Sequence, residues 1–355
     1  MVAPMISGKK LQIEKAGGYE VLQWKDFPVA QAQDDQVVVA TKAVGVNYAD
    51  CLVRWGVYES AKKFVGWPIT PGFEFSGKVL SVGPLVKNVS VGDSVVGITR
   101  FNAYSTHVTA PAHQIYKMPA ELNFEQAAGF PAVYLTAYHS LFQIAHLFPK
   151  SKILVHSAAG GVGTALCQLA RRAGFYVVGV VGSQHKVEVA KSCGADEVIV
   201  RDPEGTFWKT LKEKCPQGYD AVFDAQGPES YRKSFDLLGS SGKLFVYGAH
   251  GLMPKQGGRI NWIKLAWTAI RQNVTFKPFE MITFNRSICG FNVSFLFDKK
   301  EMISGGMEAL FQALKEGTLK APPVETFSFA DVAKAHQRIE SGQSVGKIVL
   351  TNNFS

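Results

Sequence analysis

Apolar and polar residues follow two different rhythms along this chain. In the first 130 residues, short β-branched runs such as "VVVATKAVGVN" (37–47) and "SGKVLSVG" (76–83) alternate with glycine-containing turns. Runs of this kind, bounded by frequent turn residues, are typical of a β-rich domain. From about residue 133 the spacing becomes helical, and "LTAYHSLFQIAHL" (135–147) predicts the first helix of this region.

The middle of the chain alternates strands with helices. Apolar runs predict strands at 152–157, 176–182, 197–201, 221–226, 243–248 and 288–292. The helices predicted between them cover 162–173, 185–193, 206–215 and 229–238. Strands that alternate with helices form βαβ units, whose parallel sheet is covered by helices on both faces. The sequence therefore predicts an α/β domain with a doubly wound parallel sheet.

The end of the chain loses this alternation. A helix (300–316), a strand (323–329), a second helix (330–341) and a final strand (346–350) are predicted there. A chain of 355 residues is long enough for about two domains. We therefore predict that residues 1–132 and 293–355 form one domain and that residues 133–292 form the other.

A glycine cluster follows the first strand of the α/β region. The stretch "HSAAGGVG" (156–163) runs from that strand into a predicted helix, as a dinucleotide-binding turn requires. Glycines here would let the backbone approach a pyrophosphate and let the helix lie close to the strand, with helix N–H groups facing the phosphates. A purely structural turn is the alternative. The candidate cofactor contacts are Ala159, Gly160, Gly161, Val162 and Gly163.

The end of the second strand distinguishes NAD from NADP. NAD sites usually carry an acidic residue about 20 residues after the glycine turn, where it binds the ribose 2′-hydroxyl. Here "VVGSQHK" (180–186) contains no acid, and Gly182 is followed by Ser183 and Lys186. A hydroxyl and an ammonium suit a 2′-phosphate, and Arg201 after the next strand could supply a second cation. NADPH is therefore the expected cofactor, although Lys186 and Arg201 could also be solvated surface side chains.

The charge and the cysteine content of the chain limit which ligands and which cellular compartment we expect. The net charge of +9 favours anionic ligands, although a solvated basic surface is the simpler explanation. The sequence contains no nucleic-acid recognition module, so nucleic-acid binding is not expected. The five cysteines form no CxxC pair, the N-terminus lacks the apolar core of a secretory signal, and no apolar run reaches the roughly 18 residues of a membrane span. A cytoplasmic protein without disulfides is expected.

Histidine and cysteine spacing predicts no metal site. Zinc needs several well-placed nitrogen or sulfur ligands, and three cannot be assembled from the sequence. No Ser-His-Asp or Cys-His nucleophile has a supporting context either. The histidines considered are scattered without metal-like spacing, at His107, His113, His139 and His146.

With these residues established, the chain resembles the medium-chain dehydrogenase/reductase superfamily. Within it, the resemblance is to the zinc-free NADPH:quinone oxidoreductases that include zeta-crystallin. The segments "NRSICGFNVSFLF" (285–297) and 249–285 are similar to the vesicle amine transport protein branch. The resemblance covers nearly the whole chain and rests on "GVNYADCLVRWGVY" (45–58), "PGFEFSGKV" (71–79), "NAYSTHV" (102–108), "AAGFPAVYLTAY" (127–138), "HSAAGGVG" (156–163), "GKLFVYG" (242–248) and "GKIVL" (346–350).

The resemblance implies a Rossmann NADPH-binding domain joined to a β-rich, GroES-like catalytic domain. Zinc-dependent relatives carry a catalytic cysteine near the position of Val46 or Asn47, and a histidine where this chain has Phe73 in "GFE". The chain also lacks the four-cysteine lobe of a structural zinc site. Without a metal to polarise an alcohol, the expected substrate accepts a hydride directly, as a quinone or an activated enone does.

The resemblance also implies roles for particular side chains. Asn47, Tyr58 and Thr136 would border the nicotinamide and the substrate entrance, with Thr136 beginning a helix that faces the cofactor. Tyr48 would be a candidate proton donor, with water as the alternative source. The structural alternatives are a turn role for Asn47, packing for Tyr58 and helix capping for Thr136.

Further residues would line the cofactor. Gln226 and Gly227 would face the adenosine, and Asp224 would be structural or next to the ribose. Lys347 would either reach the phosphates or lie on an edge strand. Backbone groups would bond the nicotinamide amide and its ribose at Gly248, Ala249, Phe291 and Asn292.

Two alternatives to a quinone reductase stay open. The first is an NADPH-dependent enone or alkenal double-bond reductase. The second is a cofactor-gated, membrane-associated binding protein with little turnover, because "GGRINWIKLAWTAIRQ" (257–272) has apolar residues at helical spacing and basic flanks. That helix could equally pack on its own domain or on a dimer partner. The resemblance implies a homodimer or homotetramer that pairs its sheets edge to edge.

Overall fold

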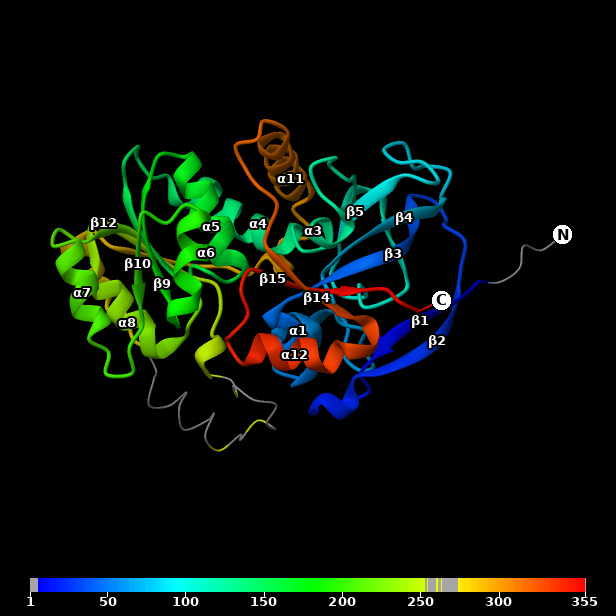
Figure 1. Ribbon diagram of the computed structural model, residues 1–355, viewed down its shortest axis with the longest axis horizontal. Helices are drawn as coiled ribbons and strands as arrows, with labels where there is room; N and C mark the ends of the chain where they lie inside the picture. The colour runs from blue at the N-terminus through cyan, green and yellow to red at the C-terminus, as the bar shows by residue number, and fades with distance from the viewer. Residues whose placement is uncertain (1–5, 253, 255–259, 261–262, 264–273, 355) are drawn as a thin grey trace.

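The computed structural model describes residues 6–252, 254, 260, 263 and 274–354. Figure 1 shows two halves side by side, each built around its own sheet, with the end of the chain running between them. One half holds a six-stranded sheet and the other a seven-stranded sheet. Residues of the two halves meet at the boundary between them, where Gly160 pairs with Gly346 and the Tyr48 hydroxyl donates to the His250 carbonyl, and the candidate site lies there.

The six-stranded sheet is parallel throughout. Its strands lie in the order β10-β9-β8-β11-β12-β13, which is 3-2-1-4-5-6 when they are numbered along the chain. In a doubly wound sheet of this order, ligands bind beyond the carboxyl ends of the strands where the order reverses, here between β8 and β11. The strands are β8 (Lys152–His156), β9 (Tyr176–Val181), β10 (Glu197–Val200), β11 (Tyr219–Asp224), β12 (Leu238–Val246) and β13 (Ser287–Gly290).

Helices connect successive strands of this sheet, and the α/β prediction is confirmed. Strand residues such as Val155, Val178 and Phe223 are fully buried, as expected when helices cover both faces. The connecting helices begin and end within two residues of the predicted limits. They are α5 (Gly161–Arg172), α6 (Val187–Ser192), α7 (Phe207–Lys214) and α8 (Pro228–Asp236).

The observed strand limits differ from the predicted ones by at most two residues, except at the start of β12. β12 begins at Leu238, five residues earlier than predicted, because the glycine and serine residues of "LGSSG" continue the strand across an irregular register instead of turning. β13 ends at Gly290, so Phe291 and Asn292 lie beyond the strand in the loop that follows. This end of the loop faces the other half of the molecule.

The seven-stranded sheet combines segments from both ends of the chain. β15 pairs antiparallel with β3 and parallel with β14, and β6 pairs with β3 beside the main path β14-β15-β3-β4-β5-β7. A separate hairpin, β1 (Ile6–Gln12) and β2 (Gln23–Val29), precedes it. The strands are β3 (Gln36–Val46), β4 (Glu74–Val82), β5 (Ser94–Ile98), β6 (His107–Pro111), β7 (Ile115–Lys117), β14 (Val324–Ser328) and β15 (Lys347–Thr351).

The remaining helices pack around this sheet and at the boundary between the halves. Figure 1 shows α12 beside α1 and α11 beside α4. Short 3₁₀ turns cover 19–21, 112–114, 184–186, 250–252, 293–295 and 329–331. The longer helices are α1 (Tyr48–Arg54), α2 (Glu59–Phe64), α3 (Phe124–Ala128), α4 (Pro131–Tyr138), α10 (Pro278–Phe284), α11 (Lys300–Lys315) and α12 (Val332–Glu340).

The helix predicted over 135–147 is wrong in its start and in its type. α4 begins at Pro131, where proline suits the first helical position because its missing N–H would be unpaired anyway. A π-helix then runs over His139–Ala145 and ends at His146, which has a left-handed φ of 48°. Thr136 therefore lies inside α4 and does not begin it.

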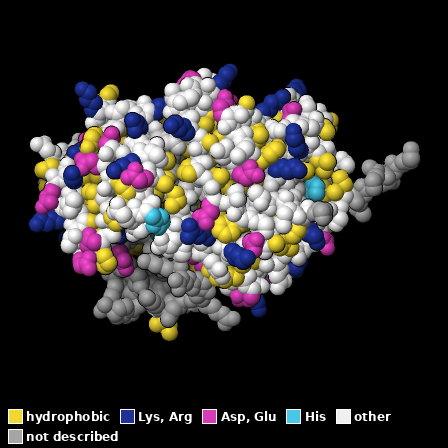
Figure 2. All heavy atoms as spheres, in the orientation of Figure 1, with side chains coloured by type: hydrophobic (Ala, Val, Ile, Leu, Met, Phe, Trp, Pro, Cys, Tyr) yellow, Lys and Arg dark blue, Asp and Glu magenta, His cyan; other side chains and the backbone are white. Residues whose placement is uncertain are grey.

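The surface gives two further observations. On the face in Figure 2, basic and acidic side chains are interspersed, so the net charge of +9 is not gathered into one patch there. No helix among the described residues is long and apolar enough to cross a membrane. The predicted amphipathic helix 257–272 lies outside the described residues except for Ile260 and Ile263.

Candidate cofactor cleft and active site

The glycine turn joins β8 to α5 at the point where the strand order reverses. Ser157 takes a left-handed φ of 55°, and Gly160 is the residue before the first turn of α5. A Cβ on Gly163 would collide with the Ser157 carbonyl oxygen, so only glycine allows the helix to approach the strand this closely. A Cβ on Gly160 would meet only one atom within 4 Å, which leaves room above the turn for a ligand. The turn therefore has the shape that a pyrophosphate needs.

The end of the chain closes one side of this turn. The Gly346 N–H donates to the Ala159 carbonyl at 2.8 Å, and Gly160 and Gly346 form a parallel bridge. Gly161 is half-buried, and Val162 is half-buried against the core. The turn is thus fixed from the side of β15.

The ends of β9 and β10 hold a group of cations. The Lys186 ammonium donates to the Gly342 carbonyl at 2.6 Å, and burial together with the charges of Arg338 and Arg201 lowers its pKa. Burial also lowers the pKa of Arg201, opposed by Asp224. Ser183 Oγ lies 3.2 Å from His185 Nδ1 in the same turn. Arg338 belongs to α12 and already pairs with Glu325 at 2.9 Å, so Lys186 and Arg201 are the cations that would stabilise an anion at these strand ends.

Residues after β11 support the glycine turn from beneath. The Gln226 amide donates to Ser157 Oγ at 2.5 Å, and its backbone N–H donates to Asp224 Oδ1 at 2.7 Å. Asp224 is fully buried and also accepts from Ser234. Gly227 precedes α8 with a φ of 135° that favours glycine. Gln226 therefore contacts the turn itself, and Asp224 holds Gln226 in place.

The segments after β12 and β13 form the opposite wall. The Gly248 carbonyl accepts from the Tyr231 hydroxyl, and Ala249 follows it half-buried. The Phe291 ring stacks on Tyr247 with ring centroids 5.8 Å apart. The Asn292 side chain accepts from the Ser294 N–H at 3.0 Å. Backbone groups of these segments therefore lie at the carboxyl edge of the sheet, where the nicotinamide half of a dinucleotide would extend.

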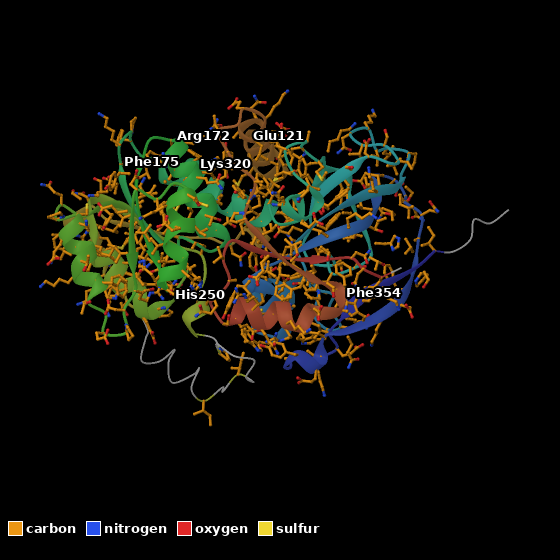
Figure 3. All side chains as sticks on the ribbon, viewed as in Figure 1. Glu121, Arg172, Phe175, His250, Lys320 and Phe354 are labelled. Atoms are coloured by element: carbon orange, nitrogen blue, oxygen red, sulfur yellow. The ribbon has the colours of Figure 1, made fainter. Side chains whose placement is uncertain are left out.

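Side chains of the other half reach this wall across the cleft. The Tyr48 hydroxyl donates to the His250 carbonyl at 3.2 Å, and Figure 3 labels His250 at the boundary between the halves. The Tyr58 hydroxyl donates to Asn292 Oδ1 at 3.1 Å and to Ser294 Oγ at 3.2 Å. Burial raises the pKa of the Tyr48 hydroxyl, so it keeps its proton at neutral pH.

Asn47 and Thr136 are held by internal bonds. Asn47 Nδ2 donates to Glu74 Oε1 at 2.9 Å, and its Oδ1 accepts from the Lys347 ammonium at 2.5 Å. Lys347 is buried and its ammonium lies 2.7 Å from Glu74, so it does not extend free toward the cleft. Thr136 Oγ1 donates to the Ala132 carbonyl one turn earlier in α4 at 2.7 Å.

Comparisons with known proteins agree with this architecture. Residues 33–120 match the family "Alcohol dehydrogenase GroES-like domain", and residues 193–350 match the family "Zinc-binding dehydrogenase". The human synaptic vesicle membrane protein VAT-1 homolog is 32% identical over 337 residues, covering 94% of this chain and 84% of that protein. The chain belongs to the quinone oxidoreductase family of medium-chain dehydrogenases/reductases.

Two solved structures share the whole fold. Escherichia coli quinone oxidoreductase, solved with NADPH, superposes with a TM-score of 0.81 at 26% identity over 97% of this chain and 99% of that one. The CurK enoyl reductase superposes with a TM-score of 0.83 at 25% identity and the same coverage. The predicted GroES-like and Rossmann architecture is thereby confirmed.

The name of one matching family, "Zinc-binding dehydrogenase", refers to a bound zinc ion. The side chains of this chain can be compared with those that such a zinc ion needs. Phe73 and Asn47 occupy the positions where the resemblance places zinc ligands, and neither a phenyl ring nor an Asn already bonded to Glu74 and Lys347 supplies a thiolate or imidazole. The residues present therefore do not fit a catalytic zinc at this position.

A different group of side chains that could bind a metal ion was not predicted from the sequence. Among the described residues, Cys51, His336 and Glu340 bring their ligand atoms within 4.8 Å of one another, all buried. The buried Arg54 guanidinium lies among them, with Nη2 2.8 Å from Glu340 and Nη1 3.1 Å from His336 Nδ1. Burial and this neighbouring charge hold the pKa of His336 well below its usual range. The Arg54 guanidinium, a permanent cation, already bonds the Glu340 and His336 atoms that a metal would need, and its charge disfavours a second cation there.

The buried network continues from this group to the turn that carries Asn47. The Tyr104 hydroxyl lies 3.4 Å from His336 Nε2 and donates to Asp50 Oδ2 at 3.1 Å. Asp50 also accepts from the N–H groups of Asn47 and Gly72. Sequence spacing could not reveal this network, because its members come from segments nearly 300 residues apart.

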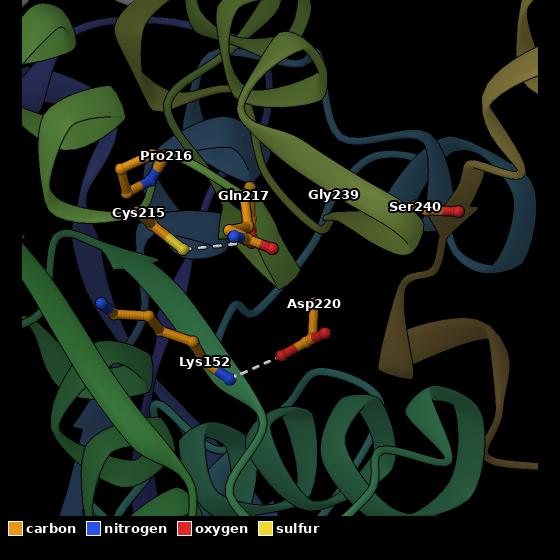
Figure 4. Close-up of a pocket in the computed structure, with 8 residues that line it drawn as sticks. Lys152, Cys215, Pro216, Gln217, Asp220, Gly239 and Ser240 are labelled. Atoms are coloured by element: carbon orange, nitrogen blue, oxygen red, sulfur yellow. Dashed lines mark hydrogen bonds between the residues drawn. The ribbon is translucent and has the colours of Figure 1, made fainter.

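An open pocket of about 490 Å³ lies elsewhere, at the amino ends of β8, β11 and β12 (Figure 4). Lys152 N–H donates to Asp220 there, and Cys215 Sγ donates to the Gly218 carbonyl. Ligands of parallel α/β sheets bind at the opposite, carboxyl edge. This pocket is therefore separate from the candidate site.

Proposed function

We propose that this protein is a zinc-independent reductase that transfers a hydride from NADPH to a quinone. The observation that carries the proposal is the pair of cations Lys186 and Arg201 at strand ends without an acid, because two such cations suit a 2′-phosphate. The family membership and the NADPH in the solved E. coli relative support it. NADPH supplies the hydride when bound.

The chain's own residues would bind, orient and shield the reactants. Gly160 and the start of α5 would bind the pyrophosphate, and Gln226 would hold the turn against the adenosine side. Asn47 has one amide hydrogen left to donate to a carbonyl oxygen after its bond to Glu74. Tyr48 keeps its proton and could deliver it to a developing enolate or hydroquinone oxygen, with water as the alternative donor.

An enone or alkenal double-bond reductase is the second candidate. The whole-chain similarity to the CurK enoyl reductase favours it, because the same cleft and cofactor would serve either acceptor. In both cases the hydride acceptor is an activated double-bond system that needs no metal. The two candidates differ in the shape of the substrate and in the atom that finally takes the proton, which is oxygen in a quinone and carbon in an enone or alkenal.

A panel of acceptors tests both candidates. NADPH oxidation would be followed with 1,2- and 1,4-quinones and with small enones, with NADH as the comparator. Turnover with quinones supports the first proposal, and turnover with enones alone supports the second. Tight NADPH binding without turnover on any acceptor would favour a binding protein.

We propose two kinds of association, one between copies of this chain and one with membranes. β13 is an edge strand of the six-stranded sheet, so pairing of β13 with its copy would give a homodimer, which light scattering after gel filtration tests. Membrane association is proposed only for segment 257–272. Liposome co-sedimentation that is lost on Trp262→Ser and Trp267→Ser would support it.

A further inference from the structure

Glu74 lies at the centre of a buried hydrogen-bond group at the cleft. Its side chain is fully buried in β4, and its carboxylate accepts from three donors of three different segments. Asn47 Nδ2 donates to Oε1 at 2.9 Å, the Ala132 N–H at the start of α4 donates to Oε2 at 2.7 Å, and the Lys347 ammonium lies 2.7 Å from Oε1. A buried carboxylate bonded to this many donors is held in a fixed position.

Glycines make the space for this group. A Cβ on Gly45 would lie 2.5 Å from Glu74 Oε1 and 2.5 Å from the Ala128 carbonyl oxygen. A Cβ on Gly129 would lie 2.8 Å from Lys347 Cγ. Both distances are too short for a real side chain, so the backbone leaves room for the carboxylate on one side and for the lysine stem on the other.

The charges of this pair decide how the Asn47 amide is turned. A carboxylate only accepts hydrogen bonds and an ammonium only donates them. With Glu74 on one side and Lys347 on the other, the amide nitrogen must face Glu74 and the amide oxygen must face Lys347. A flipped amide would point its oxygen at Glu74 and its N–H groups at Lys347, which is unfavourable at both ends.

The same pair lies next to the cofactor turn. Lys347 follows Gly346, whose N–H holds the Ala159 carbonyl, and a Cβ on Gly161 would lie 3.6 Å from Lys347 Cδ. Asn47 precedes α1, and Ala132 belongs to α4, which carries Thr136. The turn, α1 and α4 therefore meet at one ion pair.

We propose that Glu74 and Lys347 are positioning residues that fix the Asn47 amide in one orientation, with its second N–H available to the hydride acceptor or to the cofactor carboxamide. This inference rests on the proposed NADPH-dependent reduction. Because the protein's own charges set the orientation of the amide, an arriving acceptor does not have to rearrange it.

The main test removes the pair without leaving one buried charge alone. Glu74→Gln with Lys347→Met replaces both charged groups by neutral ones of similar size, because a single substitution would orphan its partner. The variant is compared with wild type, with Asn47→Ala, and with the triple variant. The measurements are kcat and KM for NADPH and 1,2-naphthoquinone.

We expect the effects of the pair substitution and of Asn47→Ala on kcat to be non-additive. The pair variant should lose about tenfold or more in kcat with little change in quinone KM, and the same change in the Asn47→Ala background should cost less than about twofold. A purely structural pair would cost the same factor in both backgrounds, and that outcome overturns the proposal. An unchanged kcat in the pair variant also overturns it.

A second measurement works without cofactor or turnover. With ¹⁵N-labelled asparagine, the side-chain signals lost on Asn47→Ala identify the Asn47 amide. They should be shifted away from the free-amide region in wild type and in Lys347→Arg, which keeps the donor, and should return to that region in the pair variant. Signals at the free-amide position in wild type overturn the proposal. If wild type reduces no quinone, the proposed function fails, while this spectrum still decides the orientation.

Discussion

At the residue scale, we expect the choice between NADPH and NADH to depend on two positions after β9. We expect Ser183→Asp with Lys186→Ala to raise the KM for NADPH by about tenfold to a hundredfold and to favour NADH. The new carboxylate would repel a 2′-phosphate and could bind a ribose 2′-hydroxyl, and the substitution also removes the bond from Lys186 to Gly342. Steady-state kinetics with both cofactors measure the change.

The control for this change is Lys191→Ala. Lys191 is an exposed lysine of the neighbouring helix α6, in an ion pair with Glu188, so its loss should leave both KM values within about twofold. An unaltered ratio of NADPH to NADH preference in the double variant would contradict the assignment of the 2′-phosphate site.

A second residue-scale prediction concerns pH. Burial raises the pKa of Asp50 from 3.8 to about 7, although hydrogen bonds from Asn47, Gly72 and Tyr104 favour the charged form. The folded protein therefore holds a proton that the unfolded chain releases above about pH 4. The contribution of Asp50 to the free energy of unfolding should fall as pH rises from about 4 to 7, and it should be flat above that.

Urea unfolding at pH 5 and pH 8 measures this contribution. Wild type should lose more free energy of unfolding between these values than Asp50→Asn, which cannot titrate. Glu121→Gln, at an exposed carboxylate, should behave as wild type. Parallel changes in wild type and Asp50→Asn would show that Asp50 does not titrate in this window.

At the element scale, the approach of α5 to β8 depends on one missing side chain. Gly163→Ala would drive a Cβ into the Ser157 carbonyl oxygen, so the start of the helix would have to move. We expect a loss of about 1–3 kcal/mol in the free energy of unfolding and at least a tenfold weaker NADPH affinity. Thermal unfolding and fluorescence titration measure these changes.

The matched control is Gly305→Ala in α11. Its Cβ would meet no atom within 4 Å, and alanine favours a helix interior over glycine by about 0.5–1 kcal/mol. This variant should be as stable as wild type or more stable, with unchanged NADPH affinity. Equal losses of stability and of NADPH affinity in Gly163→Ala and Gly305→Ala would mean that the turn geometry has no special role.

Element boundaries were predictable wherever hydrophobic periodicity was strong. The strands and helices of the six-stranded sheet follow the predicted alternation, because each buried strand reads as a continuous apolar run. The helix around Thr136 was predicted less well. A π-helix keeps the apolar character of "HSLFQIA" but changes its period, so the pattern did not reveal where α4 ends.

At the scale of the whole molecule, the prediction concerns zinc. Ligand-type residues do gather at Cys51, His336 and Glu340, but the Arg54 guanidinium lies between them. We expect the purified protein to contain far less than one zinc per chain by mass spectrometry. Dialysis against EDTA should leave both the melting temperature and NADPH-dependent turnover unchanged. Zinc at one per chain that resists dialysis would contradict this.

Local patterns by themselves determined the class of the fold, the glycine turn and the absence of an acid after the second strand. These are properties of neighbouring residues, and the chain records them directly as spacing and side-chain chemistry. The roles proposed for Asn47, Tyr48 and Tyr58 come from the resemblance to known reductases, and no local pattern of this chain predicts them.

Tertiary structure decided which distant side chains meet. Lys347 was predicted to reach the phosphates or to lie on an edge strand. The edge-strand alternative is wrong, because β15 lies between β14 and β3, and this pairing brings the Lys347 ammonium 2.7 Å from Glu74 and against Asn47. Likewise, only the tertiary structure brings Arg54 into contact with His336 and Glu340, close to Cys51. Hydrogen bonds and ion pairs act over a few ångströms, and the sequence does not encode distances across 300 residues except through the packing of the whole chain.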